Sequence, residues 1–315
     1  MRCPVDFKIV EQLAVCRDAC YVDSVKTGHD ALIQMTATLQ RGSFRSPLRY
    51  PGGKQRAAKR IADLFPNDKP LRIASPFFGG GSVELELASR GHTIVGSDFF
   101  APVAAFWQQL KINRDDLHAM AMDFVPDMDK ETFYGLQSDL RKELAKSKPC
   151  FKRLAWLFFV INRSSFSGAT LSGGMATGDR FNENSVERLR TVDMDKITVK
   201  HTYFADGATP GDYWNELFDR KRRRFRFDAV YADPPYCLEV SKLYGDQGST
   251  HESFDHKRFA KHMKWCSDQG ARVVISYNDC PTVRELFKGW NFRDISWKYG
   301  MNTSKQSNEI LITNF

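Results

Sequence analysis

The sequence predicts an α/β protein built on an open, mainly parallel sheet, with an inserted region that is mainly helical. Apolar runs of strand length recur towards both ends of the chain, at 71–75, 92–98, 227–232 and 271–276, and they alternate with helix-prone stretches. Between about residues 104 and 200 the pattern changes to helices and loops. The 315 residues are enough for one large domain or two modest ones.

The composition indicates a globular protein with a polyanionic partner. Lys and Arg total 46 against 38 Asp and Glu, which gives a net charge of +8, and aromatic residues make up 13% of the chain. The seven cysteines include no Cys-x2-Cys pair and no matching set of histidines, so we expect neither a metal site nor a disulfide framework. We find no signal peptide and no apolar run long enough to span a bilayer, so we expect a cytoplasmic protein without membrane contact.

The first motif follows an N-terminal extension, residues 1–44, to which we assign no chemistry. R-Y-P-G-G-K, at 49–54, lies within a stretch, 41–60, that contains seven basic residues and no acidic one, and it precedes a predicted helix at 55–64. The glycines allow backbone N–H groups to approach a ligand, and Lys54 supplies a charge for an anion such as a carboxylate. A Pro-Gly turn beside a solvated basic helix is the structural alternative.

A glycine-rich turn comes next. The strand at 71–75 leads into P-F-F-G-G-G-S at 76–82, and a helix-prone run, 83–89, follows. Strand, glycine turn and helix together can cradle a nucleotide-like ligand, but the spacing matches neither the dinucleotide fingerprint nor the triphosphate loop. Asp98 ends the next strand, about 17 residues after the last glycine, where an acid can hold ribose hydroxyls. The pattern predicts an adenosine-type cofactor; a tight structural turn is the alternative.

Two stretches offer contacts to phosphate. The apolar run 154–161 leads into N-R-S-S-F-S-G at 162–168 and a loop, 171–181, rich in Gly, Ser and Thr. Further on, six of the seven residues 220–226 are basic. We expect phosphate contacts from both stretches, although ordinary surface loops have similar compositions. The candidate DNA-binding residues are Asn162, Arg163, Ser165, Arg180, Arg222, Arg223 and Arg224.

The motif that indicates the chemistry is D-P-P-Y at 233–236, directly after the strand 227–232. It places a carboxylate, proline carbonyls and an aromatic ring at the carboxyl end of a central strand, where open α/β sheets bind ligands. Asp233 and a proline carbonyl can both accept hydrogen bonds from the exocyclic amine of a planar base, and Tyr236 can stack on its face. The alternative is that the prolines only end a strand and Asp233 caps a turn.

Together these motifs resemble the DNA adenine methylase (Dam) family of N6-adenine methyltransferases. The resemblance covers residues 45–315 in order. Its motifs are R-Y-P-G-G-K at 49–54, F-x-G-x-G-S at 77–82, the strand-end acid Asp98, N-R-x-x-F-S-G at 162–168, D-P-P-Y at 233–236, F-D-H at 254–256 and E-I-L-I-T-N at 309–314.

The resemblance implies a seven-stranded, Rossmann-like methyltransferase fold that binds S-adenosylmethionine. It implies a catalytic domain of residues 45–110 and 200–315, with target recognition in the inserted region, 111–199. The implied cofactor-binding residues are Tyr50 and Lys54 at the methionine end, Phe77, Gly79 and Gly81 along the cofactor, Asp98 at the ribose, Asp206 at the adenine, and Asp233. Asp206 follows from F-A-D at 204–206, although the family usually has the acid before the aromatic residue.

The target adenine is implied to lie against Asp233, Pro234, Pro235 and Tyr236 after it is flipped out of the duplex, at a cost of roughly a few kcal/mol. The chain departs from the family at Phe100, where Asn is common, and its loop at 171–180 does not look like the recognition hairpin of GATC-specific members. The target sequence is therefore left open.

The expected function is methylation of N6 of adenine in a specific sequence of double-stranded DNA, by a solitary enzyme or by the partner of a restriction endonuclease. Methylation of cytosine N4 usually uses Ser in place of Asp233, and methylation of glutamine usually uses Asn. A non-catalytic DNA-binding or anti-restriction protein that keeps the fold is the alternative from a different class.

Overall fold

A computed structural model describes the chain in seven segments. They are residues 44–177, 180–202, 213, 217–219, 224–237, 254–295 and 309–315. Contacts divide the chain into Met1–Arg41 and Gly42–Phe315, and all described residues belong to the second unit. Residues 1–43 of the N-terminal extension, Asp206, Arg222 and Arg223 lie outside the described residues, and Arg224 is described by its backbone only.

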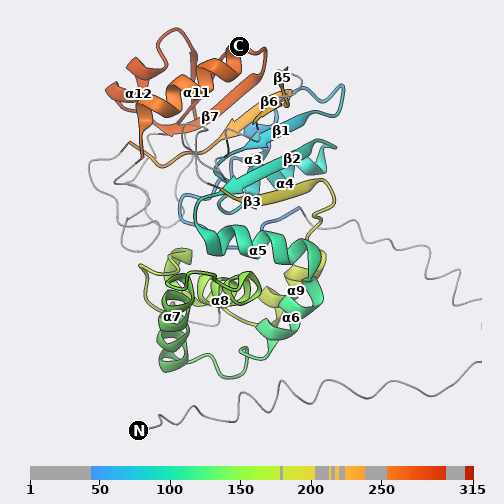
Figure 1. The fold of residues 1–315 in the computed structure, drawn as a ribbon, viewed down its shortest axis with the longest axis vertical. Helices are drawn as coiled ribbons and strands as arrows, with labels where there is room; N and C mark the ends of the chain where they lie inside the picture. Colours follow the sequence, from blue (N-terminus) through green and yellow to red (C-terminus); the bar gives the residue numbers. More distant parts are fainter. Residues whose placement is uncertain are drawn as a thin grey trace, which may run out of the picture. The chain divides into compact units, whose positions relative to one another are not determined.

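The fold is organised around a seven-stranded sheet with the order β3-β2-β1-β6-β7-β9-β8 (Figure 1). Its strands are β1 (Arg72–Ser75), β2 (Thr93–Asp98), β3 (Ile197–His201), β6 (Ala229–Ala232), β7 (Arg272–Asn278), β8 (Asn291–Asp294) and β9 (Glu309–Thr313). The first five strands in this order run parallel, whereas β9 is antiparallel to both β7 and β8. The predicted α/β class and mainly parallel sheet are confirmed. A separate two-stranded ribbon pairs β4 (Phe218–Asp219) with β5 (Arg224–Phe225).

Two strands of the sheet, β3 and β8, were not predicted from the sequence. The prediction extended the region of helices and loops to residue 200, where β3 lies, and it placed no strand at 291–294. Both lie at edges of the sheet and pair on one side only. In β3, buried Ile197 and Val199 alternate with exposed Thr198, and in β8 none of the four residues is fully buried. Half-exposed edge strands lack the continuous apolar run that marks a central parallel strand, so their signal is weaker.

Helices cover both faces of the sheet. Successive residues of a buried strand point to opposite faces, so they belong to different apolar cores. Ala229 and Tyr231 of β6 belong to one apolar core, which includes α3 (Ala58–Ala62) and α4 (Ser82–Ser89). Val230 and Ala232 belong to a second core, which includes α11 (His256–Asp268) and α12 (Pro281–Leu286). All four side chains are buried. This two-sided burial explains why β6 has an uninterrupted apolar sequence.

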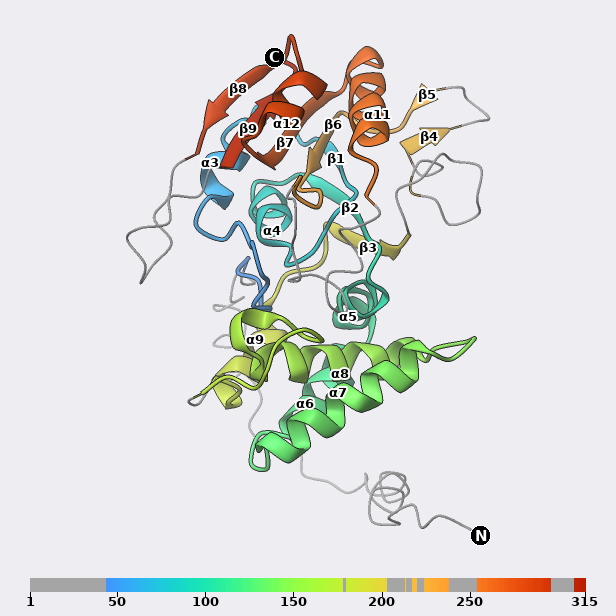
Figure 2. The same cartoon turned by 90° about the vertical axis from the view of Figure 1, so that its left-hand side faces the viewer.

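The helices α5 to α9 lie between β2 and β3 along the chain and beyond the β3 edge of the sheet (Figure 2), and α6 to α9 fall within the inserted region predicted at 111–199. They are α5 (Ala101–Ile112), α6 (Arg114–Met122), α7 (Lys130–Leu144), α8 (Phe151–Ser164) and α9 (Glu183–Thr191). The apolar run 154–161 is the buried core of α8, and Phe159 stacks on Phe106 of α5 with ring centroids 5.6 Å apart. The short helix η1 (Phe166–Gly168) follows α8 directly. Within the described segments, no helix combines the length and apolar character needed to cross a membrane.

Candidate functional site

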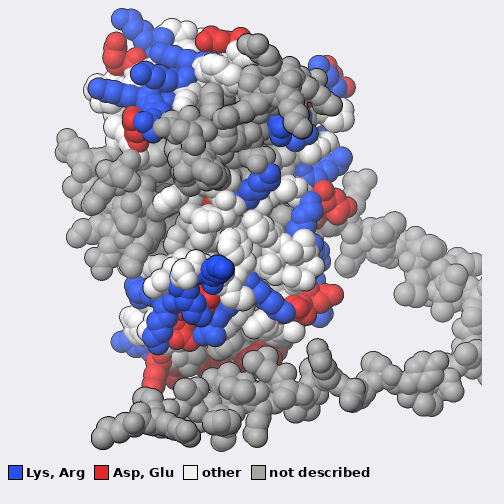
Figure 3. Space-filling model, in the orientation of Figure 1, with Lys and Arg blue, Asp and Glu red and all other residues white. Residues whose placement is uncertain are grey.

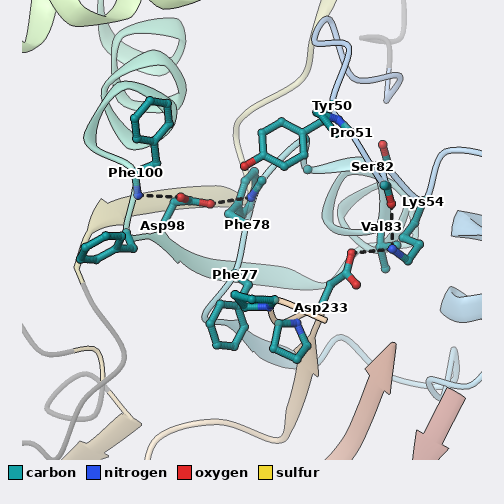
Figure 4. Close-up of a pocket in the computed structure, with 18 of the residues that line it drawn as sticks. Tyr50, Pro51, Lys54, Phe77, Phe78, Ser82, Val83, Asp98, Phe100 and Asp233 are labelled. Atoms are coloured by element: carbon teal, nitrogen blue, oxygen red, sulfur yellow. Dashed lines mark hydrogen bonds and ion pairs between the residues drawn. The ribbon is translucent and has the colours of Figure 1, made fainter. Parts of the chain in front are cut away.

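A cavity of about 350 Å³ opens at the carboxyl ends of β1, β2 and β6 (Figure 4). From β1 the chain continues to β2 on one side, while β6 pairs with β1 on the other, so the cavity lies where the strand order reverses. Such a switch point is where open α/β sheets bind ligands. Its walls come from residues 50–54, 77–84, 98–100, 231, 233–236, 254, 255 and 258. The three motifs R-Y-P-G-G-K, F-x-G-x-G-S and D-P-P-Y therefore meet at one cavity.

The glycine turn between β1 and α4 forms one wall. Gly79 and Gly81 have φ angles of +48° and +65°, in the left-handed region that favours glycine. A Cβ atom at Gly81 would lie 2.6 Å from the Phe78 ring, and one at Gly79 would lie 2.9 Å from the Tyr50 ring. The indole Nε1 of Trp107 donates to the Gly79 carbonyl at 2.9 Å and holds the turn from α5. Glycines thus bring backbone rather than side chains to the cavity.

Asp98, at the end of β2, is tied to the same turn. Its Oδ2 accepts from the Gly79 N–H at 2.8 Å, and its Oδ1 accepts from the Phe100 N–H at 2.9 Å. Burial raises the pKa of Asp98 to about 6, and the two backbone hydrogen bonds oppose that rise. A carboxylate has about four lone-pair sites, so these two bonds leave capacity to accept hydroxyl groups of a ligand.

The opposite wall carries an ion pair between Lys54 and Asp233. Nζ of Lys54 lies 2.9 Å from Oδ2 of Asp233, donates to the Gly52 carbonyl at 2.7 Å and lies 4.0 Å from Oε1 of Glu309. Lys54 is only 4% exposed, and its Nζ lies 5.2 Å from the centroid of the Tyr236 ring. Burial raises the pKa of Asp233, and Lys54 opposes this. Oδ1 of Asp233 is buried and has no hydrogen-bond partner among the described residues.

Sequence reasoning missed a third acid of the cavity, Glu84. This residue lies in the first turn of α4, and its Oε1 accepts from the Ser75 hydroxyl at 2.6 Å. Burial raises the pKa of Glu84 to about 8, against the hydrogen bond from Ser75, so the side chain is mainly protonated at neutral pH. An acid in the first turn of a helix normally indicates a favourable charge at a solvated helix end, so the position of Glu84 in the sequence does not predict its burial.

Asn162, predicted to contact DNA, is fully buried at the end of α8. Its Oδ1 accepts from the Arg49 N–H at 3.0 Å, while its Nδ2 donates to the carbonyls of Arg49 at 2.7 Å and Gly168 at 3.1 Å. Gly168 has a φ of +78°, and a Cβ there would overlap the Arg49 carbonyl. The inserted region is thus attached to the R-Y-P-G-G-K turn, and the DNA contact of Asn162 stays a prediction.

The other predicted DNA-binding residues of this region lie close by. Ser165 is buried, and its hydroxyl donates to the Asn162 carbonyl at 3.1 Å, while Arg180 is exposed. Arg163 is 8% exposed; it donates to the carbonyls of Pro47 at 3.5 Å and Arg180 at 3.3 Å, and its Nε is buried without a hydrogen-bond partner in the described segments. Direct contact of Arg163 and Ser165 with DNA stays a prediction.

These residues belong to an arginine cluster, which we define as Arg49, Arg163, Arg180 and Arg188. Burial, Arg188 and Arg49 lower the pKa of Arg163 to about 10, and burial and Arg180 lower the pKa of Arg49. None of the four forms an ion pair with an acid in the described part of the chain. On the face drawn in Figure 3, Lys and Arg gather over the helical region and again near α11 and α12. Four neighbouring cations that form no ion pair within the described residues favour an anion.

Comparison with known proteins agrees with this site. The model of the family described as D12 class N6 adenine-specific DNA methyltransferase matches residues 50–301. The type II methyltransferase M1.LlaDCHI of Lactococcus lactis subsp. cremoris is 25% identical over an alignment of 286 residues that covers 87% of this chain and 96% of that protein. A DNA N-6-adenine-methyltransferase of Escherichia phage P1 is 24% identical over 260 residues, 79% of this chain but 32% of that protein.

The family match includes the residues of the three motifs that line the cavity, and it extends through the inserted helices, β7 and β8. The resemblance and the enzyme class predicted from the sequence are confirmed. The chain belongs to the D12 class of N6 adenine-specific DNA methyltransferases.

Proposed function

We propose that the protein transfers a methyl group from S-adenosylmethionine to N6 of an adenine that is flipped out of a specific sequence of double-stranded DNA. The single observation that carries the proposal is Oδ1 of Asp233, a buried acceptor without a described partner, in a cavity that also contains a glycine turn and Asp98. Burying a hydrogen-bond acceptor without a partner costs free energy. Because this acceptor lies in a cavity, we expect a ligand to supply the donor.

The cavity fits S-adenosylmethionine in size and in chemistry. Its volume of about 350 Å³ lies within the usual range of small-molecule sites, about 300–1,000 Å³. When bound, this cofactor supplies an electrophilic methyl group on a sulfonium ion. We assign Phe77, Gly79 and Gly81 to the sides of the cofactor, Asp98 to its ribose hydroxyls, and Tyr50 and Lys54 to its methionine end. We retain Asp206 for its adenine.

The D-P-P-Y segment is suited to the amine of the target base. Oδ1 of Asp233 and the Pro234 carbonyl can each accept one N–H of the amine, which frees the nitrogen lone pair to point at an electrophile. Pro235 keeps the turn rigid, and the ring of Tyr236 can stack on the base. The raised pKa of Asp233 also suits Oδ1 to take the proton that the amine loses. The base must leave the stack to reach this position.

Duplex DNA is proposed to lie against the inserted helical region. The arginine cluster offers charge for backbone phosphates, and Phe166, on the tight turn after α8, exposes 63% of its surface although it is a large apolar residue. An exposed aromatic ring can stack on bases or enter the space left by a flipped base. We also assign Ser165 and the basic run containing Arg222, Arg223 and Arg224 to DNA contact. A restriction endonuclease of the same specificity is the partner we propose, by analogy with the type II relative.

The test is to express the protein in a host that lacks adenine methylation and to map N6-methyladenine by single-molecule sequencing of the host DNA. We expect methylation within one short motif, which would establish the base and the specificity together. The control is the Asp233→Ala variant expressed at the same level. A folded wild-type protein that binds S-adenosylmethionine but leaves the DNA unmethylated would contradict the proposal and favour a non-catalytic DNA-binding or anti-restriction role.

A further inference from the structure

The D-P-P-Y segment has no regular secondary structure to hold it in place. Residues 233–237 belong to neither a helix nor a strand, and Pro234 and Pro235 have no N–H to donate. The ring of Tyr236, however, must keep one tilt if it is to stack on a base. The contacts that fix this ring must therefore come from elsewhere in the fold.

One such contact comes from Tyr277, near the carboxyl end of β7. The rings of Tyr236 and Tyr277 stack with centroids 6.2 Å apart and an interplanar angle of 28°. Tyr277 is fully buried; its ring makes an edge contact with Phe259, with centroids 6.1 Å apart, and a tilted contact with Phe287, with centroids 6.5 Å apart. A ring that is packed on several sides has one orientation, and it transmits that orientation to the ring stacked on it.

The hydroxyl of Tyr277 is anchored in turn by Nδ1 of His256, at the start of α11. Burial raises the pKa of Tyr277 well above its ordinary value. Burial also lowers the pKa of His256, against the nearby charge of Asp255. At neutral pH both groups are therefore neutral, and the tautomer of the imidazole decides which of them donates the hydrogen bond. His256 belongs to the F-D-H motif, to which sequence reasoning assigned no role beyond family resemblance.

The next residue of β7, Asn278, holds the backbone that follows Tyr236. Its Oδ1 accepts from the Cys237 N–H at 2.8 Å, and its Nδ2 donates to the Cys237 carbonyl at 2.9 Å. One amide thus satisfies both polar backbone groups of Cys237, although the two residues are 41 positions apart. Two hydrogen bonds from one planar group fix the direction of the backbone as well as its distance.

We propose that Tyr277 and Asn278 are positioning residues for Tyr236, with His256 securing Tyr277. Tyr277 sets the tilt of the Tyr236 ring, and Asn278 sets the path of the chain immediately behind it. The inference rests on the proposed function, because it concerns how Tyr236 meets a target adenine. It goes beyond that function in assigning roles to two residues outside the D-P-P-Y motif.

The test compares wild type with Tyr277→Phe, Tyr277→Leu and Asn278→Ala. The control is Tyr213→Phe, which removes another buried hydroxyl, one that donates to the Val95 carbonyl at 2.9 Å. The measurements are kcat and KM on a duplex carrying the mapped motif, the fluorescence of 2-aminopurine placed at the target adenine, and the Kd of S-adenosylmethionine by calorimetry.

For Tyr277→Leu and Asn278→Ala we expect kcat to fall by about tenfold or more, because a small misplacement of a positioning group is costly. The 2-aminopurine signal should rise as stacking on Tyr236 weakens, while the cofactor Kd stays within about twofold of wild type. Tyr277→Phe keeps the ring and should lose only about threefold in kcat. Tyr213→Phe should match wild type.

Two outcomes would overturn the inference. One is wild-type kcat and wild-type fluorescence in both Tyr277→Leu and Asn278→Ala. The other is a parallel loss of kcat and cofactor affinity in Tyr277→Phe, which would indicate a general structural role. A wild-type enzyme that fails to methylate adenine would instead contradict the proposed function, so the two failures are distinguishable.

Discussion

Nζ of Lys54 lies 2.9 Å from Oδ2 of Asp233, although 179 positions separate the two residues. The pair joins the R-Y-P-G-G-K turn to the end of the central strand β6. Burial alone would favour the neutral form of Asp233, and the buried ammonium group of Lys54 opposes that tendency. The charge of Asp233, which we assign to the target amine, therefore depends on Lys54, which we also assign to the cofactor.

Replacing Lys54 with Met should move the acid limb of the pH–rate profile to higher pH. Without the cation the pKa of Asp233 rises further, so the carboxylate is ionised only in more alkaline solution. At pH 7 we expect kcat to fall by about tenfold or more, with partial recovery towards pH 9. The measurement is kcat between pH 5 and 9, with Lys59→Met, an exposed lysine of α3, as the control. An unshifted profile would show that Lys54 does not set the charge of Asp233.

Replacing Asp233 with Ala should abolish methyl transfer and leave cofactor binding largely intact. The variant removes the acceptor Oδ1, while the glycine turn and Asp98 stay in place. Breaking a buried ion pair typically costs about 3–5 kcal/mol, but Glu309, 4.0 Å from Lys54, keeps a counter-charge and should reduce that cost. Methyl incorporation and calorimetry with S-adenosylmethionine test this, with Asp63→Ala, a surface ion-pair partner of Arg90, as the control. Near wild-type turnover would refute the role of Asp233.

Cofactor affinity should fall as pH drops through about 6. The pKa of Asp98 is about 6, and the side chain accepts ribose hydroxyls best when ionised, so binding is strongest above this pH and weakens below it. Asp98→Asn should bind at least about tenfold more weakly at pH 8 and lose the pH dependence around 6. Calorimetry from pH 5 to 8 on both proteins measures this. The same pH dependence in the variant would assign it to another group.

Replacing Glu84 with Gln should stabilise the protein at alkaline pH. The folded pKa of Glu84, about 8, lies above its ordinary value of 4.5. The protonated side chain therefore contributes stability that is complete below pH 4.5 and is lost as pH rises through 8. Gln is always neutral and can still accept from Ser75, so the difference in Tm in its favour should grow from pH 5 to 8 and level off above. Thermal unfolding at several pH values measures this, and a constant difference would contradict it.

Removing charges from the arginine cluster should weaken DNA binding and its salt dependence. Arg180→Gln and Arg188→Gln each remove an exposed cation, so each should lower the slope of log K against log salt by about 1 if it meets a phosphate. Fluorescence anisotropy between 50 and 200 mM salt, as in such titrations, measures the slope. Arg284→Gln, whose side chain pairs with Asp279, is the control. Unchanged slopes in both variants would remove the cluster from the DNA interface.

The sequence predicted the parts of the site that follow from neighbouring residues. Strand, glycine turn and helix are adjacent at 71–89, so Gly79 and Gly81 could be placed at a ligand site before the structure was known. The same reasoning placed Asp98 and Asp233 at the ends of predicted strands. Local order along the chain is sufficient for such features.

Contacts between residues far apart in the sequence could not be predicted from it. Asn162 binds the backbone of Arg49, 113 positions away, and no spacing rule connects an amide to a backbone group at that separation. Tyr277 and Asn278 lie just beyond the strand predicted at 271–276, and no role was predicted for them because their partners at 236 and 237 follow another strand. Polar side chains that bind backbone leave no complementary residue type in the sequence, so only the folded chain reveals them.

The attachment of Asn162 to Arg49 has a consequence for engineering new specificities. An inserted helical region borrowed from a relative would meet this chain at a junction where Asn162 must reach both Arg49 and Gly168, and where position 168 has no room for a Cβ. A transplant that ends before residue 162 keeps this junction native, whereas one that crosses it must import residues 49 and 162–168 as a set. A chimera that takes residue 49 from one protein and residues 162–168 from another would combine contact surfaces that did not evolve together.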